Sequence, residues 1–223
     1  MCFSATASFT SGAVLAVIGI ASLKNVRTMQ EGFFAFIPLI FSIQQIAEGF
    51  LWLALSEKTL FVSENFSTYF FIIIAQIVWP IWVPLSISLI ETNKKRKKTF
   101  LTFTVLGTCL SIAVALFLFN NKIHARIAGH HITYVMNFPI AMQIIGGVFY
   151  FMVTVVPAFI STNKKMPYLG ALILISFIVT EIFYERYVIS VWCFFGAIIS
   201  IMIYFISKDV GNKAEPKLDI VNN

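Results

Sequence analysis

Glutamine and glutamate side chains interrupt an otherwise apolar stretch, FSIQQIAEGFLW, at residues 41–52. Gln44 and Glu48 are four residues apart, so on a helix they share one face, and Gln45 and Trp52 lie close beside it. An ionisable group in a membrane helix is costly, and it tends to face the interior, where it binds a ligand, an ion or a proton. We therefore take Glu48 as the centre of a candidate site. The alternative is a protonated Glu48 that only joins helices through a hydrogen bond to Gln44.

Other side chains capable of binding or catalysis are expected near the same end of the molecule as Glu48. Gln76 and Trp79 lie near the middle of the next apolar stretch, although Gln76 could equally be a helix-to-helix hydrogen-bonding residue. A later stretch ends with Glu181 and Glu185, followed by Arg186, and a structural Arg–Glu pair is the alternative for these acids. The predicted ligand pocket comprises Gln44, Gln45, Glu48, Trp52, Gln76, Trp79, Tyr134, Glu181 and Glu185.

A transition-metal site is a second prediction for this end, with Cys2, Glu48, His130 and His131 as its ligands. Removal of Met1 would make Cys2 the N-terminus, where its amine and thiolate could chelate a metal or the thiol could act as a nucleophile. Adjacent histidines in a strand point in opposite directions, so a solvated surface role for His130 and His131 is the alternative. Cys2 could also form a disulfide with Cys193, whereas Cys109 is expected to be a small buried apolar side chain.

The composition indicates what kind of protein positions these residues. The chain has 223 residues, of which 59% are apolar and 12% charged, and its mean hydropathy is +0.88. Soluble domains carry about 25% charged and about 45–50% apolar residues. The composition therefore excludes a soluble enzyme, a disordered chain and a nucleic-acid-binding module, and it favours a protein with several membrane spans.

Seven apolar stretches are long enough to approach or reach the length of a transmembrane helix. They are residues 9–23, 33–55, 69–90, 100–119, 138–160, 168–184 and 188–206. The connecting segments are short, so we predict an all-α bundle of seven transmembrane helices in a single domain, residues 1–207. Residues 208–223 form a polar tail that is expected to be disordered. Pro80 and Pro84 predict a distortion within the third helix.

Lysine and arginine predict the orientation of this bundle. Twelve of the sixteen basic residues fall on one side if all seven helices span the membrane. The positive-inside rule then places the N-terminus outside and the C-terminus in the cytoplasm. The run KKRK at 94–97, continued by Lys98, is interpreted as a topology signal that contacts anionic lipid headgroups, and no nucleic-acid partner is expected.

The segment between the fourth and fifth helices has a different pattern. Apolar and polar residues alternate over 123–127 and 132–136, on either side of Gly129. This pattern predicts a small extracytoplasmic β-hairpin that turns at residues 128–130, with an irregular loop as the alternative. We expect the hairpin to cover a polar pocket that opens to the extracytoplasmic side and has Glu48 as its deepest charge.

Four segments carry a resemblance to a known family: MCFSATASF, QQIAEGFLW, WPIWVPLSISLIE and VWCFFGA. With them the chain resembles a family of uncharacterised bacterial membrane proteins whose members begin Met-Cys-Phe-Ser-Ala. The resemblance implies a seven-helix protein of the bacterial cytoplasmic membrane, and it implies no activity.

The leading functional hypothesis is the binding of a small ligand or metal ion in the outward-facing pocket, for sensing or transport. Two alternatives remain open. One is a membrane-embedded enzyme that acts on a lipid or quinone-like substrate, with Glu48 as acid or base or with a metal site. The other is a structural subunit that requires a partner protein. The lipid bilayer is the partner expected in every case, and the oligomeric state is left open.

Overall fold

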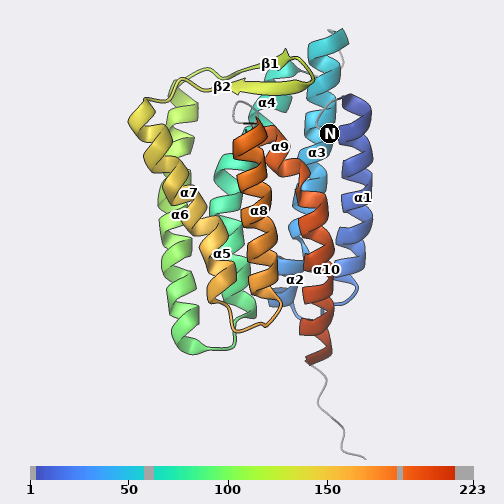
Figure 1. The fold of residues 1–223 in the computed structure, drawn as a ribbon, viewed down its shortest axis with the longest axis vertical. Helices are drawn as coiled ribbons and strands as arrows, with labels where there is room; N and C mark the ends of the chain where they lie inside the picture. Colours follow the sequence, from blue (N-terminus) through green and yellow to red (C-terminus); the bar gives the residue numbers. More distant parts are fainter. Residues whose placement is uncertain (1–3, 58–62, 185–187, 214–223) are drawn as a thin grey trace, which may run out of the picture.

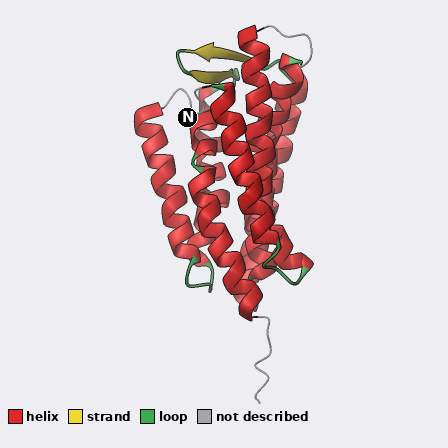
Figure 2. Cartoon of the chain, turned by 90° about the vertical axis from the view of Figure 1, so that its right-hand side faces the viewer, coloured by secondary structure: helices red, strands yellow, loops and turns green. Residues whose placement is uncertain are grey.

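Seven helical stretches of the computed structural model are long and apolar enough to cross a membrane. The structure describes residues 4–57, 63–184 and 188–213. Within them the candidate spans are Ala5–Leu23, Ile37–Ser56, Glu64–Ile90, Lys94–Asn120, Ile140–Ile160, Met166–Phe183 and Ile189–Asn212. They run side by side along the long axis of the molecule (Figures 1 and 2). The prediction of seven apolar helices is confirmed.

The helices and strands subdivide these spans. Their order is α1 (Ala5–Leu23), α2 (Met29–Ala35), α3 (Ile37–Glu57), α4 (Glu64–Ile73), the π-helical turn η1 (Ile74–Val78), α5 (Trp79–Ile90), α6 (Lys94–Asn120), β1 (His124–Ala128), β2 (His131–Val135), α7 (Ile140–Ile160), α8 (Met166–Tyr184), α9 (Val188–Phe194) and α10 (Gly196–Lys213). The predicted second span therefore begins inside α2. That short helix starts at a capping box in which Thr28 accepts from the backbone of Glu31, and the Glu31 carboxylate accepts from the backbone of Thr28.

The third span contains the distortion that its prolines predict. A π-helical turn precedes Pro80, and proline has no N–H to donate to the preceding turn. Neighbouring helices donate to backbone carbonyls in this segment. The Tyr150 hydroxyl of α7 donates to the carbonyl of Ala75 at 2.7 Å, and the Ser111 hydroxyl of α6 donates to the carbonyl of Ile77 at 2.8 Å. Irregular backbone inside a membrane bundle is tolerated where other protein groups form hydrogen bonds with its unpaired carbonyls in this way.

The spans differ in how much of their surface the bundle covers. The share of buried residues is 56% for the α3 span and 50% for the α4–η1–α5 span, but only 17% for α6. The polar candidates Gln44, Glu48 and Gln76 therefore lie on the two most covered spans. Cys109 lies on α6 and is exposed. The prediction that it is buried is wrong, because α6 turns most of its surface away from the other helices.

The predicted hairpin is present between α6 and α7, where β1 and β2 pair antiparallel with Ala128 opposite His131. The turn is formed by Gly129 and His130, and Gly129 has a φ of +63°, which suits glycine. Ile123, Ala125, Ile132 and Tyr134 are buried on the face toward the helices. The hairpin lies across one end of the bundle (Figure 1). The alternative of an irregular loop is therefore excluded.

At the opposite end of the bundle a buried acid, Glu91, connects two parts of the chain, and it was not among the predicted site residues. Glu91 follows α5, is buried, and accepts hydrogen bonds from the Ser161 hydroxyl, from the backbone and hydroxyl of Thr162, and from the backbone of Asn93. This carboxylate joins the end of α5 to the loop between α7 and α8. At the same end, Lys165 pairs with Asp209 at 2.7 Å, and α10 continues to Lys213, past residue 208 where the polar tail was predicted to begin.

Acid pH should weaken the fold through Glu91. Burial alone raises the pKa of this carboxyl, but its four hydrogen bonds outweigh burial and hold the pKa below the ordinary value of 4.5. The stabilisation is therefore present above pH 4.5 and is lost as the pH falls through the lower folded-state pKa. We expect the unfolding free energy of the wild type to drop in this acid window more than that of Glu91→Gln. Detergent-solubilised protein titrated with denaturant at a series of pH values measures the difference.

The control for this titration is Glu64→Gln, which removes an exposed carboxylate at the start of α4. Its pH profile should stay parallel to that of the wild type. Parallel profiles for Glu91→Gln as well would show that the Glu91 contacts do not stabilise the charged form.

Candidate functional site

Glu48 is fully buried in α3 and connects that helix to α9. The Ser190 hydroxyl of α9 donates to Glu48 Oε1 at 2.5 Å, and Gln45 Nε2 donates to Glu48 Oε2 at 3.3 Å. All three side chains have 0% of their surface exposed. Gln45 and Glu48, both predicted site residues, are therefore in contact on one helix. Ser190 was missed because its only sequence signal is a small hydroxyl residue at the start of an apolar span.

Gln44 lies one helical turn before Glu48 and contacts the third span. The indole N–H of Trp79 donates to Gln44 Oε1 at 3.0 Å, and both side chains are buried. The Trp79 ring also packs against Phe41, with ring centroids 4.2 Å apart. The structure thus brings together Gln44 and Trp79, two predicted site residues from different spans.

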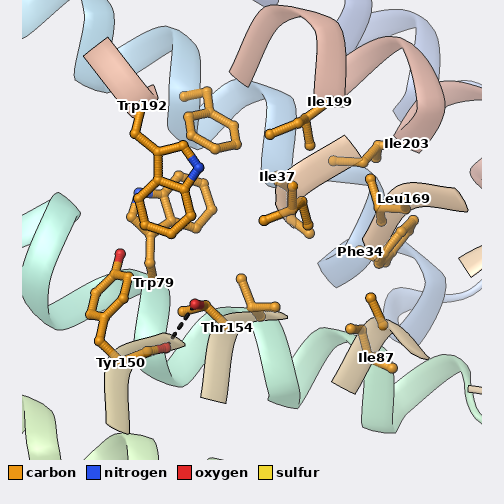
Figure 3. Close-up of a pocket in the computed structure, with 14 residues that line it drawn as sticks. Phe34, Ile37, Trp79, Ile87, Tyr150, Thr154, Leu169, Trp192, Ile199 and Ile203 are labelled. Carbon is orange, nitrogen blue, oxygen red and sulfur yellow. Dashed lines mark hydrogen bonds between the residues drawn. The ribbon is translucent and has the colours of Figure 1, made fainter. Parts of the chain in front are cut away.

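Trp79 forms part of the wall of a cavity inside the bundle (Figure 3). The cavity has a volume of about 70 Å³. Helices α2, α3, α5, α7, α8, α9 and α10 contribute its lining, which consists of Phe34, Ile37, Phe41, Trp79, Val83, Ile87, Tyr150, Thr154, Ala158, Leu169, Ile173, Trp192, Ile199 and Ile203. Trp79, Tyr150 and Trp192 gather on one side, and Leu169, Ile199 and Ile203 lie across from them (Figure 3).

This cavity differs from the pocket that the sequence predicted. Its wall is almost entirely apolar, and Trp79 is the one predicted pocket residue that lines it within the described part of the chain. Gln44 does not line the cavity, but it is hydrogen-bonded to Trp79, which does. Trp192 and Tyr150 were missed as lining residues. Their aromatic side chains were visible in the sequence, but only the packing of α7 and α9 against α5 shows that they face one space.

Trp52 and Tyr134 lie in a separate apolar cluster beneath the hairpin. The Tyr134 ring stacks on Phe71 with centroids 4.9 Å apart and planes 3° apart. The Trp52 indole N–H is buried without a hydrogen-bond partner among the described residues. The hairpin thus covers the helix ends as expected, but the space directly beneath it is filled by apolar side chains.

The remaining predicted pocket residues are not brought to Glu48 by any contact found in the described residues. Gln76 is half-buried in the π-helical turn, and Glu181 is exposed near the end of α8. Glu185 and Arg186 lie outside the described residues. The predicted Arg–Glu pair, which needs Arg186, therefore lies outside the described residues.

The predicted metal ligands are not gathered in the part of the chain that the structure describes. No group of three His, Cys, Asp or Glu side chains there could hold a metal ion. His130 is exposed at the hairpin turn, whereas Glu48 is fully buried in the bundle. His131 is half-buried, and burial together with the neighbouring His130 lowers the pKa of its imidazole below the usual value. Cys2 lies outside the described residues, so its metal, nucleophile and disulfide predictions stay predictions.

Comparison with known proteins identifies a family. The model described as "Family of unknown function (DUF6629)" matches residues 1–217. No curated protein and no solved structure matches the chain.

Proposed function

The chain belongs to the family of unknown function DUF6629, and we propose that it is a membrane protein that binds a small ligand in the cavity beside Trp79. In this proposal residues 1–207 act as one transmembrane unit, and ligand binding serves sensing or transport. The expected ligand is a small apolar molecule rather than a metal ion, because the cavity wall is apolar.

We orient the protein with the hairpin outside and the opposite end in the cytoplasm. The support is the distribution of basic residues. Lys94, Lys95, Arg96, Lys97 and Lys98 begin α6 at the end away from the hairpin, and Lys164 and Lys165 lie in the loop between α7 and α8 at that same end (Figure 1). Among the described residues the hairpin end carries Lys122 and Arg126. This asymmetry follows the positive-inside rule.

One observation carries the proposal: the Gln44–Trp79 hydrogen bond joins the buried polar residues of α3 to the wall of a cavity. Apolar cavities with a few fixed polar groups are the usual form of a small-molecule site, and in bundles they lie between helices. The alternative of an enzyme finds support in the contact between Ser190 and Glu48. Neither residue is part of the described cavity wall, so the geometry favours binding over catalysis by this pair.

Filling the cavity should abolish ligand binding. Thr154 is buried and lines the cavity, and its hydroxyl donates only to the carbonyl of Tyr150 in its own helix at 2.7 Å. We expect Thr154→Leu to occupy the space and to remove saturable quenching of tryptophan fluorescence by 1-bromopropane, a small apolar quencher. Trp79 and Trp192 line the same cavity, so binding there places bromine against both indoles.

The matched control is Thr154→Val, which removes the hydroxyl and keeps the side-chain shape. This variant should bind 1-bromopropane like the wild type. Quenching that is unsaturable in the wild type, or that persists unchanged in Thr154→Leu, would refute binding in the cavity.

A further inference from the structure

Each polar side-chain donor on the cavity wall already has a protein partner. Trp79 donates to Gln44, and the Trp192 indole N–H donates to the Ser176 hydroxyl at 3.1 Å. The Tyr150 hydroxyl donates to the carbonyl of Ala75 at 2.7 Å, and the Thr154 hydroxyl donates to the carbonyl of Tyr150 at 2.7 Å. A polar group on a ligand would lose its own hydration here without gaining one of these donors. The cavity therefore favours hydrocarbon over a hydrogen-bond acceptor in the part of the ligand that enters it.

The size of the cavity restricts the shape of that hydrocarbon. A dry cavity of about 150 Å³ in another protein holds one benzene molecule. The cavity described here has about 70 Å³, which is less than half that volume. A whole six-membered ring therefore does not fit without displacement of the wall, whereas the last few atoms of an unbranched chain, or the bromine end of a bromoalkane, can enter while the rest of the molecule stays outside.

We propose that the cavity binds the end of a linear hydrocarbon chain, of the kind carried by the acyl groups of membrane lipids. This inference rests on the proposed function and names the ligand class for the same cavity. The surrounding bilayer supplies such chains to a protein whose spans are apolar enough to sit in it. The chain end would lie between the indoles of Trp79 and Trp192 on one side and Ile199 and Ile203 on the other. A quinone-like ring would have to displace the wall to enter the cavity.

The test compares a linear with a cyclic quencher in a protein whose tryptophans are reduced to Trp79 and Trp192. The double variant Trp52→Phe, Trp82→Phe leaves only these two of the four tryptophans. We expect 1-bromohexane to quench their fluorescence saturably, and bromocyclohexane to require at least a tenfold higher concentration. Circular dichroism confirms that the double variant keeps its helices.

Enlarging the cavity provides the complementary arm of the test. Leu169 is 3% exposed and lines the cavity, so Leu169→Ala should admit bromocyclohexane and bring the two quenchers within about threefold of each other, because the removed atoms leave space. Ile203→Val is a milder enlargement for use if the first variant does not fold. It should move the ratio in the same direction by a smaller factor.

Two lipid probes identify the source of the chain. A phosphatidylcholine and a free fatty acid, each brominated at the last carbon of the chain, are compared with the same lipids brominated next to the carboxyl group. Quenching by the chain-end bromine supports the proposal, and the stronger of the two lipid probes names the source.

Equal quenching by 1-bromohexane and bromocyclohexane in the wild type would overturn the chain inference while leaving ligand binding in place. Saturable quenching by neither of them, nor by 1-bromopropane, would overturn the proposed function itself. Stronger quenching by bromine near the carboxyl group than at the chain end would also overturn the inference, because it would place the wrong part of the lipid in the cavity.

Discussion

Replacing Gly107 with alanine is expected to destabilise the protein by about 3 kcal/mol or more, the upper part of the range for overpacked interiors. An added Cβ at this position would lie 1.9 Å from the carbonyl oxygen of Pro80, whereas real Cβ atoms essentially never come closer than 3.0 Å. Pro84 has no N–H to donate to the Pro80 carbonyl, so this carbonyl lacks its usual helical hydrogen bond and faces α6 at short distance. The helices must therefore separate by more than 1 Å.

Separation of α5 and α6 would also weaken a hydrogen bond one turn further along α6. The Ser111 hydroxyl reaches the carbonyl of Ile77 at 2.8 Å in the π-helical segment, and that contact depends on the same helix spacing. Equilibrium unfolding in mixed detergent micelles measures the loss. The aromatic wall at Trp79 belongs to the displaced helix α5, so quenching by 1-bromopropane should weaken together with stability.

Gly147→Ala is the matched control for Gly107→Ala. Gly147 lies in α7, and an added Cβ there meets nothing within 4 Å. Alanine favours helix over glycine by about 1 kcal/mol, so this variant should be neutral or slightly more stable. If the two variants had the same stability, the close contact between Gly107 and Pro80 would not be a constraint on the fold.

The fold was largely predictable because hydropathy and alternation are local properties of the sequence. A span such as α6 is recognisable from its own residues, and the hairpin follows from the alternation around Gly129. The break between α2 and α3 was missed because Thr28 and Glu31 cap a helix that continues into an apolar run. The anchoring role of Glu91 was missed because its partners, Ser161 and Thr162, are 70 and 71 residues away.

The candidate site was only partly predictable for the same reason. Gln44, Gln45 and Glu48 were identified because a polar residue in an apolar helix is conspicuous on its own. Ser190 and the cavity were not, because a cavity is the space that several helices leave between them. Its apolar lining has the composition of an ordinary core, so the sequence contains no sign that Tyr150 and Trp192 face the same space as Trp79.

Glu48→Ala is expected to destabilise the protein by about 2–6 kcal/mol, because two buried donors lose their acceptor. The substitution removes the acceptor of the Ser190 and Gln45 hydrogen bonds and leaves empty volume between α3 and α9. Each buried donor that loses its acceptor costs about 1–3 kcal/mol. Equilibrium unfolding in mixed detergent micelles gives the magnitude.

Glu48→Gln separates the shape of this side chain from its acidity. A glutamine amide can turn its oxygen toward Gln45 and its NH₂ toward Ser190, whose hydroxyl can accept as well as donate. We therefore expect Glu48→Gln to cost no more than about 1 kcal/mol, the net value of a typical hydrogen bond. It should also leave the quenching of Trp79 by 1-bromopropane unchanged, because Glu48 is not part of the described cavity wall.

A double-mutant cycle with Ser190→Ala shows whether the contact itself carries the energy. Directly bonded residues couple by about 0.5–3 kcal/mol, whereas independent sites give additive losses. A coupling energy in this range between Glu48→Ala and Ser190→Ala would show that the stabilising effect of Glu48 comes from its contact with Ser190 of α9. Additive losses would mean that Glu48 acts through other contacts. In that case the hydrogen bond between Ser190 and Glu48 would not stabilise the protein, and the enzyme alternative would lose the observation that supports it.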